Sequence, residues 1–348
     1  MPVIVAIFEG TAPLNAAHVW IVCPASAKAN NGNWQTGKRW AAFLRTRYRV
    51  TLAGQWPPDA AARAASERAP QLLIALHARR SAASLAAFGA AWPLRPSVLL
   101  LTGTDLYRDI RTDAAAQASL ASASALVLLQ PAGLAELAPA LRARAGVIYQ
   151  SAPALQALPA SAARRFFDVA LIGHLRAEKD PATFMRAAAL VTAPGVRLRH
   201  IGAALEPQLG RQAAATQAAS ACYRWLGPLP HAATRQRLKR CQLMVLTSLM
   251  EGGANVIIEA ITSAVPVLAS DISGNRGMLG DAYAGYFPAG DAPALARLID
   301  RCATDAAFHA RLRAQCALRA PLFAPAVERA ALLQLVDNLL QTHTQPQG

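Results

Sequence analysis

The sequence predicts an α/β protein with two doubly wound parallel-sheet domains that face each other across a cleft. Two observations indicate this class. The chain has 348 residues, which exceeds one ordinary hydrophobic core and suits two domains of roughly 150 residues each. Short apolar segments alternate with Ala- and Arg-rich helical segments in the first half, and the alternation restarts in the second half. We expect an N-terminal extension at 1–17, a first domain at 18–155, a second domain at 165–322, and at 323–348 a helix and tail that pack back toward the first domain.

Six apolar segments of the first domain are expected to be parallel strands. His18–Cys23 is the first of them, and a helix follows over Thr36–Arg45, where apolar side chains recur at helical spacing. The other five strands are predicted at Arg49–Leu52, Leu72–Leu76, Val98–Leu101, Ala125–Leu129 and Gly146–Tyr149. Two prolines in Ser151–Arg164 indicate a linker.

The second domain repeats the pattern of strand and helix. Strands are predicted at Val169–Ile172, Leu198–Ile201, Leu243–Leu246 and Val267–Ala269. Helices are predicted at Pro181–Val191, Ala232–Arg240, Asn255–Thr262 and, near the end of the chain, Pro325–Thr342. Because ligands of such sheets bind at the carboxyl ends of the strands, the loops after the strands are the candidate binding segments.

The composition is that of a globular chain, with 54% hydrophobic and 16% charged residues. The net charge of +15 has two explanations: arginine has replaced lysine and neutral residues on a solvated surface, or the partners are anionic. No run of five basic residues and no zinc-ligand spacing is present, so we expect no nucleic-acid partner. The five cysteines are scattered, which favours reduced thiols in a cytoplasmic protein. No uncharged apolar stretch reaches about 18 residues, so we expect no integral membrane association.

The segment from Glu251 to Glu259 carries the strongest functional signal. Its two carboxylates lie eight residues apart around a Gly-Gly turn, after the strand Leu243–Leu246 and at the start of a predicted helix. Unpaired N–H groups at a helix start bind anions, and the glycines let a ligand approach the backbone. The spacing suits a diphosphate flanked by two hydroxyl-rich groups, which is the shape of a nucleotide-sugar.

The loop Gly173–Asp180 supplies cations to the same edge of the sheet. Lys179 and Arg176 can reach phosphate oxygens, or the loop is simply solvated with Glu178 and Lys179 balancing each other. No D-x-D pair follows a strand, so we expect no metal, and these cations would neutralise a departing diphosphate. The loop Ser270–Gly277 is expected to wrap a sugar or to be a flexible surface loop.

Three loops after strands of the first domain offer polar groups to the same cleft: 30–33, 77–81 and 102–109. Each also has an ordinary explanation, as a turn, as surface arginines and as a helix cap. The candidate acceptor-binding residues on these loops are Asn31, Gly32, Asn33, Arg79, Arg80, Thr104, Asp105 and Arg108.

The second half resembles the donor domain of the GT-B glycosyltransferases of family 4, over about residues 171 to 290. The matching marks are Glu251 and Glu259, Gly173 with Leu175, Glu178 and Lys179, the turn Trp225-Leu226-Gly227, and the strand start Pro266-Val267. The resemblance implies two Rossmann-like domains, and we expect no cofactor, because the UDP-sugar is a substrate. The family usually has Arg directly after the first glycine, whereas this chain has His174, so Arg176 is expected to take over the diphosphate.

A second resemblance spans residues 18 to 338 and points to the selenosugar synthases of bacterial selenoneine biosynthesis. It is carried by Asn30–Trp34, His77–Ser81, Thr102–Ile110, Tyr149–Pro153 and Met250–Glu259. It implies transfer of a hexose from a UDP-sugar, above all UDP-N-acetylglucosamine, to selenophosphate, with a 1-seleno-sugar as product after loss of phosphate.

These signals assign roles to the second domain. Glu251, His174 and Lys179 are the predicted catalytic residues. The predicted donor-binding residues are Arg176, Leu229, Gly252, Gly253, Ala254, Asn255 and Glu259. Three alternatives stay open: a related transferase that acts on a hydroxyl of a glycan or lipid, a UDP-sugar epimerase of the same fold, and a basic nucleic-acid-binding protein.

Overall fold

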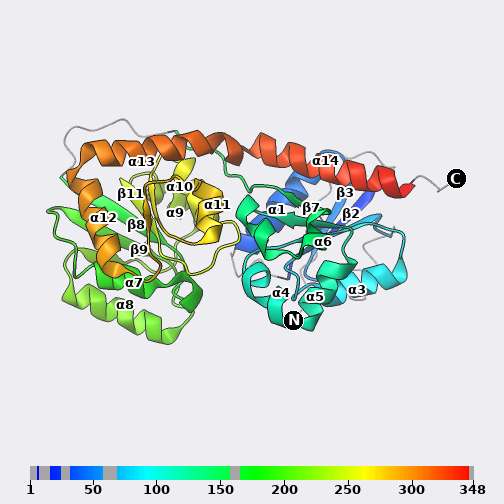
Figure 1. Ribbon diagram of the computed structural model, residues 1–348, viewed down its shortest axis with the longest axis horizontal. Helices are drawn as coiled ribbons and strands as arrows, with labels where there is room; N and C mark the ends of the chain where they lie inside the picture. The colour runs from blue at the N-terminus through cyan, green and yellow to red at the C-terminus, as the bar shows by residue number, and fades with distance from the viewer. Residues whose placement is uncertain (1–5, 8–15, 25–31, 58–68, 157–164, 345–348) are drawn as a thin grey trace. The chain divides into compact units, whose positions relative to one another are not determined.

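The computed structural model describes residues 6–7, 16–24, 32–57, 69–156 and 165–344 (Figure 1). Contacts divide the chain into two compact units. The first unit combines 1–150 with 325–348, and the second unit is 151–324. Each unit is built on one mainly parallel sheet, so the predicted class of two Rossmann-like α/β domains is confirmed.

The sheet of the first unit has seven strands in the order β1-β3-β2-β4-β5-β6-β7. All neighbours are parallel except β1, which pairs antiparallel with β3 at the edge. This edge strand lies within 1–17, where we expected only an extension. The strand bounds are β1 Ala6–Ile7, β2 His18–Val22, β3 Arg49–Ala53, β4 Leu72–Leu76, β5 Ser97–Leu100, β6 Ala125–Leu128 and β7 Ala145–Val147.

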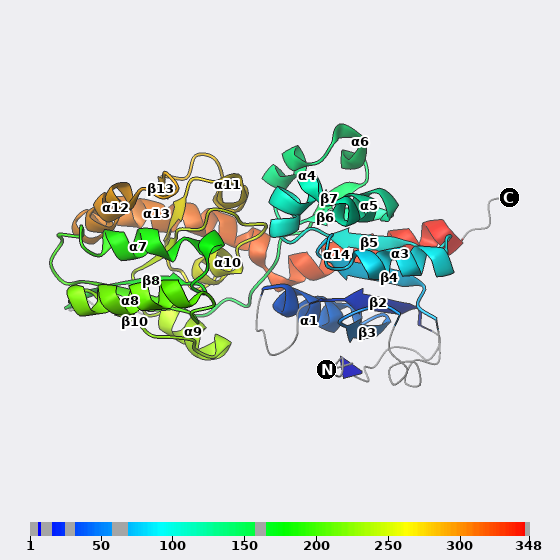
Figure 2. The ribbon, with the colours of Figure 1, turned by 90° about the horizontal axis from the view of Figure 1, so that it is seen from below.

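Two apolar cores cover the two faces of this sheet, because successive side chains of a strand point to opposite faces. Val19 and Ile21 of β2 join one core, and Trp20 and Val22 join the other. Helices α1 and α14 cover the first core, while α3 and α5 cover the second (Figure 2). The helices of this unit are α1 Gly32–Leu44, α3 Ala82–Ala91, α4 Ile110–Thr112, α5 Ala114–Ser122, α6 Pro139–Arg142 and α14 Pro325–Thr344, with a π-helical turn at Asp105–Asp109 and a 3-10 turn at Pro131–Glu136.

The C-terminal helix α14 is fixed to α1 by a buried carboxylate as well as by apolar contacts. Glu328 accepts hydrogen bonds from Arg39 Nε at 2.7 Å and from Trp40 Nε1 at 2.8 Å. Leu332 and Val336, one and two turns later, are fully buried in the core beside α1. The end of the chain therefore completes the first unit, although 174 residues of the second unit (151–324) separate it from the rest of that unit.

The sheet of the second unit has six parallel strands in the order β10-β9-β8-β11-β12-β13. The chain starts at the centre with β8, builds outward to β10, and then returns to the other side of β8 with β11. The bounds are β8 Phe167–Ile172, β9 Val196–Ile201, β10 Tyr223–Trp225, β11 Leu243–Leu246, β12 Val267–Ser270 and β13 Tyr286–Phe287.

The helices of the second unit confirm the predicted starts at Pro181 and Asn255 and add helices that were not predicted. Among the additions is α11, which covers part of the segment expected to be a sugar-wrapping loop. Gly274 lets this helix pack closely against the backbone of Glu251. A Cβ at this position would lie 2.0 Å from the Glu251 backbone oxygen, so only glycine permits the packing. The bounds are α7 Pro181–Ala187, α8 Pro207–Ala219, α9 His231–Leu238, α10 Asn255–Ile261, α11 Ser273–Leu279, α12 Ala292–Thr304 and α13 Ala306–Arg319, with 3-10 turns at Ala177–Lys179 and Ala320–Phe323.

The start of the segment expected to be a linker packs onto the second unit. Arg235 of α9 donates to the carbonyl of Pro153 at 2.7 Å, and the N–H of Leu155 donates to the carbonyl of Thr262 at 2.8 Å. No helix within the described ranges is both long enough and apolar enough to span a bilayer.

Candidate functional site

The order of strands locates the candidate site of the second unit. Ligands of doubly wound sheets bind where the strand order reverses, outside the carboxyl ends of the strands on either side of that point. In this sheet the reversal lies between β8 and β11. The loops that leave these two strands, 173–180 and 247–254, contain most of the residues predicted to bind the donor.

Glu251 joins these two loops through its side chain. Its Oε1 atom accepts a hydrogen bond from Ser248 Oγ at 2.6 Å and forms an ion pair with Lys179. Only 8% of Glu251 is exposed, so these donors offset the cost of burying its charge. Lys179 therefore pairs across the two loops with Glu251.

Backbone groups fix the same two loops to each other. Thr247 donates to the carbonyl of Lys179 at 2.8 Å, and the N–H of Leu249 donates to the carbonyl of Glu178 at 2.9 Å. Gly274 of α11 packs directly against the backbone of Glu251. The position of the Glu251 carboxylate is thus set by three separate segments, which is the kind of support that a preorganised site requires.

His174 has a defined tautomer in this structure. Its Nδ1 atom accepts a hydrogen bond from the backbone N–H of Ala203 at 3.1 Å. Burial lowers the pKa of His174, and the nearby charges of Arg176 and Lys179 lower it further. The ring is therefore neutral near pH 7, its proton is on Nε2, and it can donate a hydrogen bond from that atom but cannot accept one there.

The other predicted donor-binding residues surround these groups. Gly252 to Ala254 lead into α10, whose first residue is Asn255 and whose N-terminus has no side-chain cap. Arg176 has a buried Nε atom without a hydrogen-bond acceptor among the described residues. Leu229 lies in the loop before α9, half-buried, two residues before His231.

Glu259 lies one turn inside α10 and faces α9. Its Oε1 accepts a hydrogen bond from His231 Nε2 at 2.7 Å, and only 9% of Glu259 is exposed. This hydrogen bond raises the pKa of His231, and burial opposes the rise in part. The two predicted carboxylates therefore make different contacts. Glu251 links the loops after β8 and β11, and Glu259 links α10 to α9.

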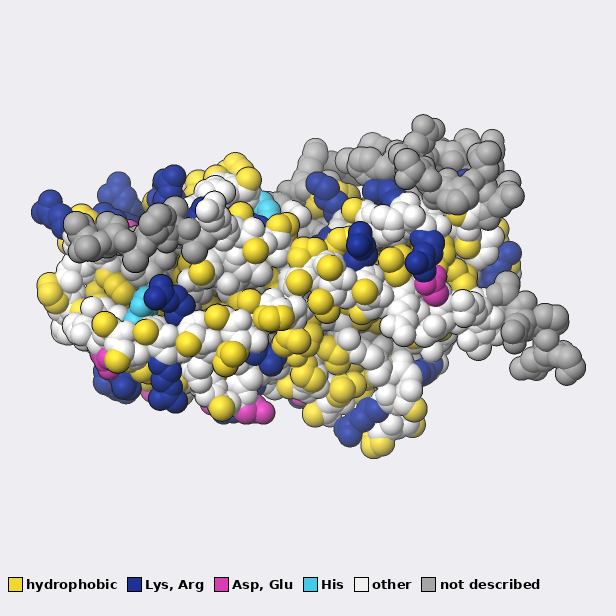
Figure 3. Space-filling model, turned by 90° about the horizontal axis from the view of Figure 1, so that it is seen from above, with side chains coloured by type: hydrophobic (Ala, Val, Ile, Leu, Met, Phe, Trp, Pro, Cys, Tyr) yellow, Lys and Arg dark blue, Asp and Glu magenta, His cyan; other side chains and the backbone are white. Residues whose placement is uncertain are grey.

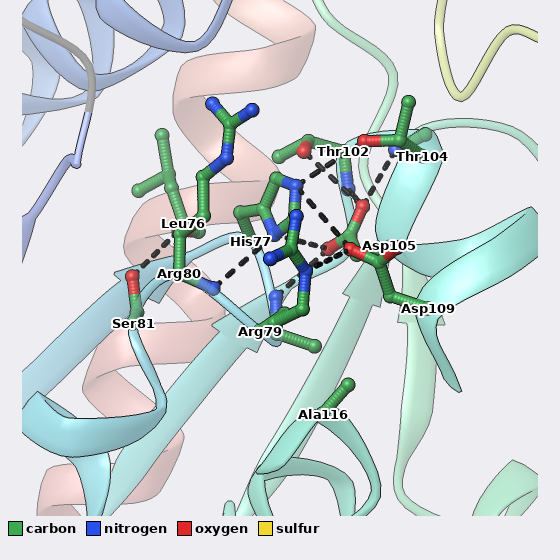
Figure 4. A network of polar contacts seen from close by, with 12 residues as sticks. Leu76, His77, Arg79, Arg80, Ser81, Thr102, Thr104, Asp105, Asp109 and Ala116 are labelled. Carbon is green, nitrogen blue, oxygen red and sulfur yellow. Dashed lines mark hydrogen bonds and ion pairs between the residues drawn. The ribbon is translucent and has the colours of Figure 1, made fainter. Parts of the chain in front are cut away.

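The first unit has its own reversal of strand order, between β2 and β4. His77 follows β4 with a positive φ of 77°, a conformation that costs energy for a residue with a Cβ. Its Nε2 atom lies 3.2 Å from Thr104 Oγ1, and the N–H of Arg80 points at its Nδ1 (Figure 4). Burial lowers the pKa of His77, and Asp105 opposes the change, so the ring is neutral and donates to Thr104.

Asp105 holds these loops together from the inside. Its side chain is fully buried and accepts hydrogen bonds from the backbone N–H groups of Ala78, Thr102 and Gly103, each at 2.9 Å. Both of its oxygens are engaged by the backbone. Asp105 thus positions the loops that carry the other predicted acceptor-binding residues.

The three predicted arginines of the first unit have different surroundings. Arg79 and Arg108 both donate to Asp109, at 2.8 and 3.1 Å. Burial raises the pKa of Asp109, but the hydrogen bonds from these arginines outweigh burial, and the net change is downward. The Arg80 side chain is exposed and points away from this network (Figure 4).

The remaining predicted residues of the first unit lie at the start of α1. Asn33, which was expected in a loop, is the second residue of α1 and donates to Thr102 Oγ1 at 3.3 Å, so the N-terminal end of α1 lies beside the loop after β5. Gly32 is the exposed first residue of α1. Asn31 lies outside the described residues.

Sequence analysis missed Ser248, His231 and Arg235. Ser248 could have been found, because it is the second residue after a predicted strand and lies three residues before Glu251. Nothing in the sequence links His231 to Glu259, since their contact depends on the packing of α9 against α10. No cluster of three His, Cys, Asp or Glu side chains suited to a metal ion occurs in the part of the chain that the structure describes.

The basic side chains do not gather in one patch on the face drawn in Figure 3. On the face drawn in Figure 3, Lys and Arg side chains are scattered over both halves of the view, with few Asp or Glu between them. This distribution agrees with the first explanation of the net charge, arginine on a solvated surface, and leaves the local charges of the loops as the specific feature.

Comparisons with known proteins match both the sequence and the fold. Residues 163–319 match the family described as glycosyl transferases group 1. The structure is similar to sucrose-phosphate synthase from Thermosynechococcus elongatus, with 16% identity, a TM-score of 0.76, and coverage of 94% of this chain and 100% of the other. It is also similar to Alr3699/HepE from Anabaena in complex with UDP and glucose, with 16% identity, a TM-score of 0.70, and coverage of 93% and 100%. The pneumococcal O-GlcNAc transferase GtfA in complex with UDP and GlcNAc matches with 17% identity and a TM-score of 0.59, over 77% of this chain and 57% of the other.

Proposed function

We propose that this chain, whose residues 163–319 match the family of glycosyl transferases group 1, transfers a hexose from a UDP-sugar to a small anionic acceptor. One observation carries the proposal: Glu251, Lys179 and Ser248 form a connected polar cluster where the strand order of the second sheet reverses. The similar fold of HepE, which was solved with UDP and glucose, supports a UDP-sugar as the donor.

The donor would bind along the loops after β8 and β11. Glu259 would accept hydrogen bonds from the ribose hydroxyls, and Glu251 would do so from the hexose. The backbone N–H groups from Gly252 to Asn255 would hold the diphosphate. Lys179 and Arg176 would stabilise the negative charge that develops as UDP departs, without a metal ion. Arg176 suits this role because its Nε lacks an acceptor within the described chain.

His174 would act as a neutral hydrogen-bond donor beside the anomeric carbon. Because Nδ1 already accepts from Ala203, the Nε2–H group is the one available to an oxygen of the sugar or the leaving phosphate. A neutral donor at this position does not require a proton transfer. It can therefore assist departure of UDP over the whole pH range above its lowered pKa.

We further propose selenophosphate as the acceptor, held by the loops after β4 and β5. Arg80 is exposed and suited to bidentate contact with an oxyanion, and Arg79, Arg108, Asn33 and Thr104 surround the same loops. A lone pair of selenium would form the carbon–selenium bond while the bond from the anomeric carbon to the UDP oxygen breaks and UDP takes the electron pair. Water would then cleave the selenium–phosphorus bond and release phosphate and the 1-seleno-sugar.

Two features of the chain agree with this chemistry. A selenophosphate anion needs little deprotonation, so no strong general base is required. Bringing it to an anionic donor costs about 4 kcal/mol for each pair of like charges about 4 Å apart near a protein surface, and local cations offset that cost. We propose the cytoplasm as its location, and all five cysteines are free thiols.

Mass spectrometry of the products tests both levels of the proposal. The protein would be incubated with UDP-N-acetylglucosamine or UDP-glucose, with and without selenophosphate, in the presence of a chelator. The expected result is UDP together with a product that carries the selenium isotope pattern, formed only when selenophosphate is present. Transfer to a hydroxyl of a glycan or lipid would reject selenophosphate as the acceptor, but the UDP-sugar would remain the proposed donor. An isomer of the UDP-sugar, which has the same mass and is separated by chromatography, would identify an epimerase and reject the transferase if it formed without any acceptor.

A further inference from the structure

The pair of Glu259 and His231 leaves one carboxylate oxygen available to a ligand. His231 Nε2 donates to Oε1 of Glu259 at 2.7 Å, and no group among the described residues donates to Oε2. The His231 side chain is 46% exposed and that of Glu259 is 11% exposed. Glu259 is thus held from the solvent side by a residue that sequence analysis did not single out.

Arg235 lies near this pair and has a buried donor atom without a partner among the described residues. Arg235 is one turn after His231 on α9, so both side chains lie on the face of α9 that packs against α10. The guanidinium of Arg235 donates from Nη2 to Pro153 and Thr262, but its Nε is buried without a partner within the described chain. The charge of Glu259 acts on Arg235, which shows that the two groups are near each other.

Glu259 is therefore near two basic residues of α9, and its hydrogen bond is to His231, the more exposed of the two. This hydrogen bond holds Oε1 in place and so fixes the orientation of the carboxylate.

We propose that His231 is a positioning residue for the donor, which holds Glu259 so that Oε2 can accept a hydrogen bond from a ribose hydroxyl. This inference rests on the proposed function, since it takes a nucleotide with a ribose diol as the ligand. It assigns His231 no contact with the reacting atoms.

Calorimetric titration with UDP and with 2′,3′-dideoxy-UDP tests the role of His231. We expect His231→Ala to weaken UDP binding about tenfold, because one charge-assisted hydrogen bond no longer positions the carboxylate. His231→Gln should recover most of the affinity, because its amide nitrogen can donate to Glu259. Binding of the dideoxy analogue, which has no ribose hydroxyls, should be the same in the wild type and in His231→Ala.

Kinetics with the UDP-sugar give a second readout. His231→Ala should raise the donor KM about tenfold and change kcat by less than about twofold, because only binding of the ribose is affected. His309→Ala is the matched control: His309 lies on α13 of the same unit, donates to the carbonyl of Gln242 at 2.8 Å, and is outside the site.

The outcomes separate this inference from the proposed function. If His231→Ala weakens UDP and the dideoxy analogue equally, the residue has only a structural role and the inference is wrong. Unchanged UDP affinity in His231→Ala also rejects it, while the proposed function stands. If the wild-type protein binds neither nucleotide, the proposed function and this inference are both rejected.

Discussion

The two units hold their buried carboxylates by different kinds of donor. In the second unit, Glu251 and Glu259 accept hydrogen bonds from side chains, namely Lys179, Ser248 and His231. In the first unit, Asp105 accepts three hydrogen bonds from backbone N–H groups and is fully buried. Side-chain donors can move and exchange with the hydroxyls of a ligand, whereas backbone donors are fixed by the fold. The comparison therefore predicts that Glu251 and Glu259 serve binding and catalysis, and that Asp105 serves stability.

The largest effect is expected for Glu251→Gln. The substitution removes the charge that pairs with Lys179 and one of the groups proposed to orient the hexose. We expect kcat/KM to fall about 10³-fold, with far-UV circular dichroism unchanged. Initial rates of UDP release measure the effect. Wild-type rates in this variant would show that the carboxylate only closes the loops, and the contrast with Asp105 would be lost.

Asp105→Ala should lower the free energy of unfolding, whereas Glu251→Gln should lower the catalytic rate. The Asp105 substitution leaves three buried backbone N–H groups without an acceptor, each of which costs about 1–3 kcal/mol when unpaired. Partial rearrangement of the loops reduces the sum, so we expect a loss of about 3 kcal/mol in the free energy of unfolding of the first unit. Urea unfolding measures it. The control is Asp113→Ala, which removes a cap at the start of α5 and should cost only about 1 kcal/mol. Equal losses in both variants would contradict the structural role of Asp105.

The packing of α11 against Glu251 gives a test with an unusually close control. Gly274→Ala would place a Cβ 2.0 Å from the Glu251 backbone oxygen, so the loop after β11 must shift. A displacement of about 1 Å in a catalytic loop can cost about 10² in rate, and we expect a loss of that size in kcat/KM. Gly89→Ala, also within a helix, meets no atom within 4 Å and should leave kcat/KM unchanged. Equal rates for the two variants would show that the loop does not depend on α11.

The sequence was sufficient for the fold class, but not for the strands β1, β10 and β13, because the signals that set the class are local. Alternating apolar segments fixed the strands, and the connection between parallel strands placed their loops on one edge. The sequence could not supply the pairing of His231 with Glu259, which lie 28 residues apart and meet only because α9 packs on α10. Nor could it distinguish Asp105 from Arg80, since both lie in polar loops and only the structure shows that one is buried and the other exposed. The β1 edge strand was missed because an apolar segment at the start of a chain has no flanking pattern.

Acid should weaken the second unit through His200, a fully buried residue of strand β9. Burial lowers the pKa of His200 to about 4, and Tyr223 hydroxyl lies 2.8 Å from its Nδ1. An unfolded histidine, with a pKa near 6.5, binds a proton that the folded one excludes, so stability falls as pH falls from about 6.5 to about 4. The expected loss is about 2 kcal/mol at about pH 4.5. Urea unfolding at several pH values should show a smaller slope in His200→Gln, and an unchanged slope would remove His200 as the cause.

The smallest effect is expected for Arg80→Ala. This substitution tests whether an exposed arginine in the loops of the first unit binds the acceptor. Arg79 and Arg108 are occupied by Asp109, whereas the Arg80 guanidinium is exposed and points away from that network. A side chain in that condition can bind an anion without first breaking an ion pair. We therefore expect Arg80→Ala to raise the KM for selenophosphate about tenfold, with the donor KM and the free energy of unfolding unchanged. Arg111→Ala, which removes an exposed arginine paired with Glu136 in the same unit, is the control and should leave both KM values unchanged. An equal response to the two substitutions would mean that the first unit acts through its overall charge, and that no arginine of these loops recognises the acceptor.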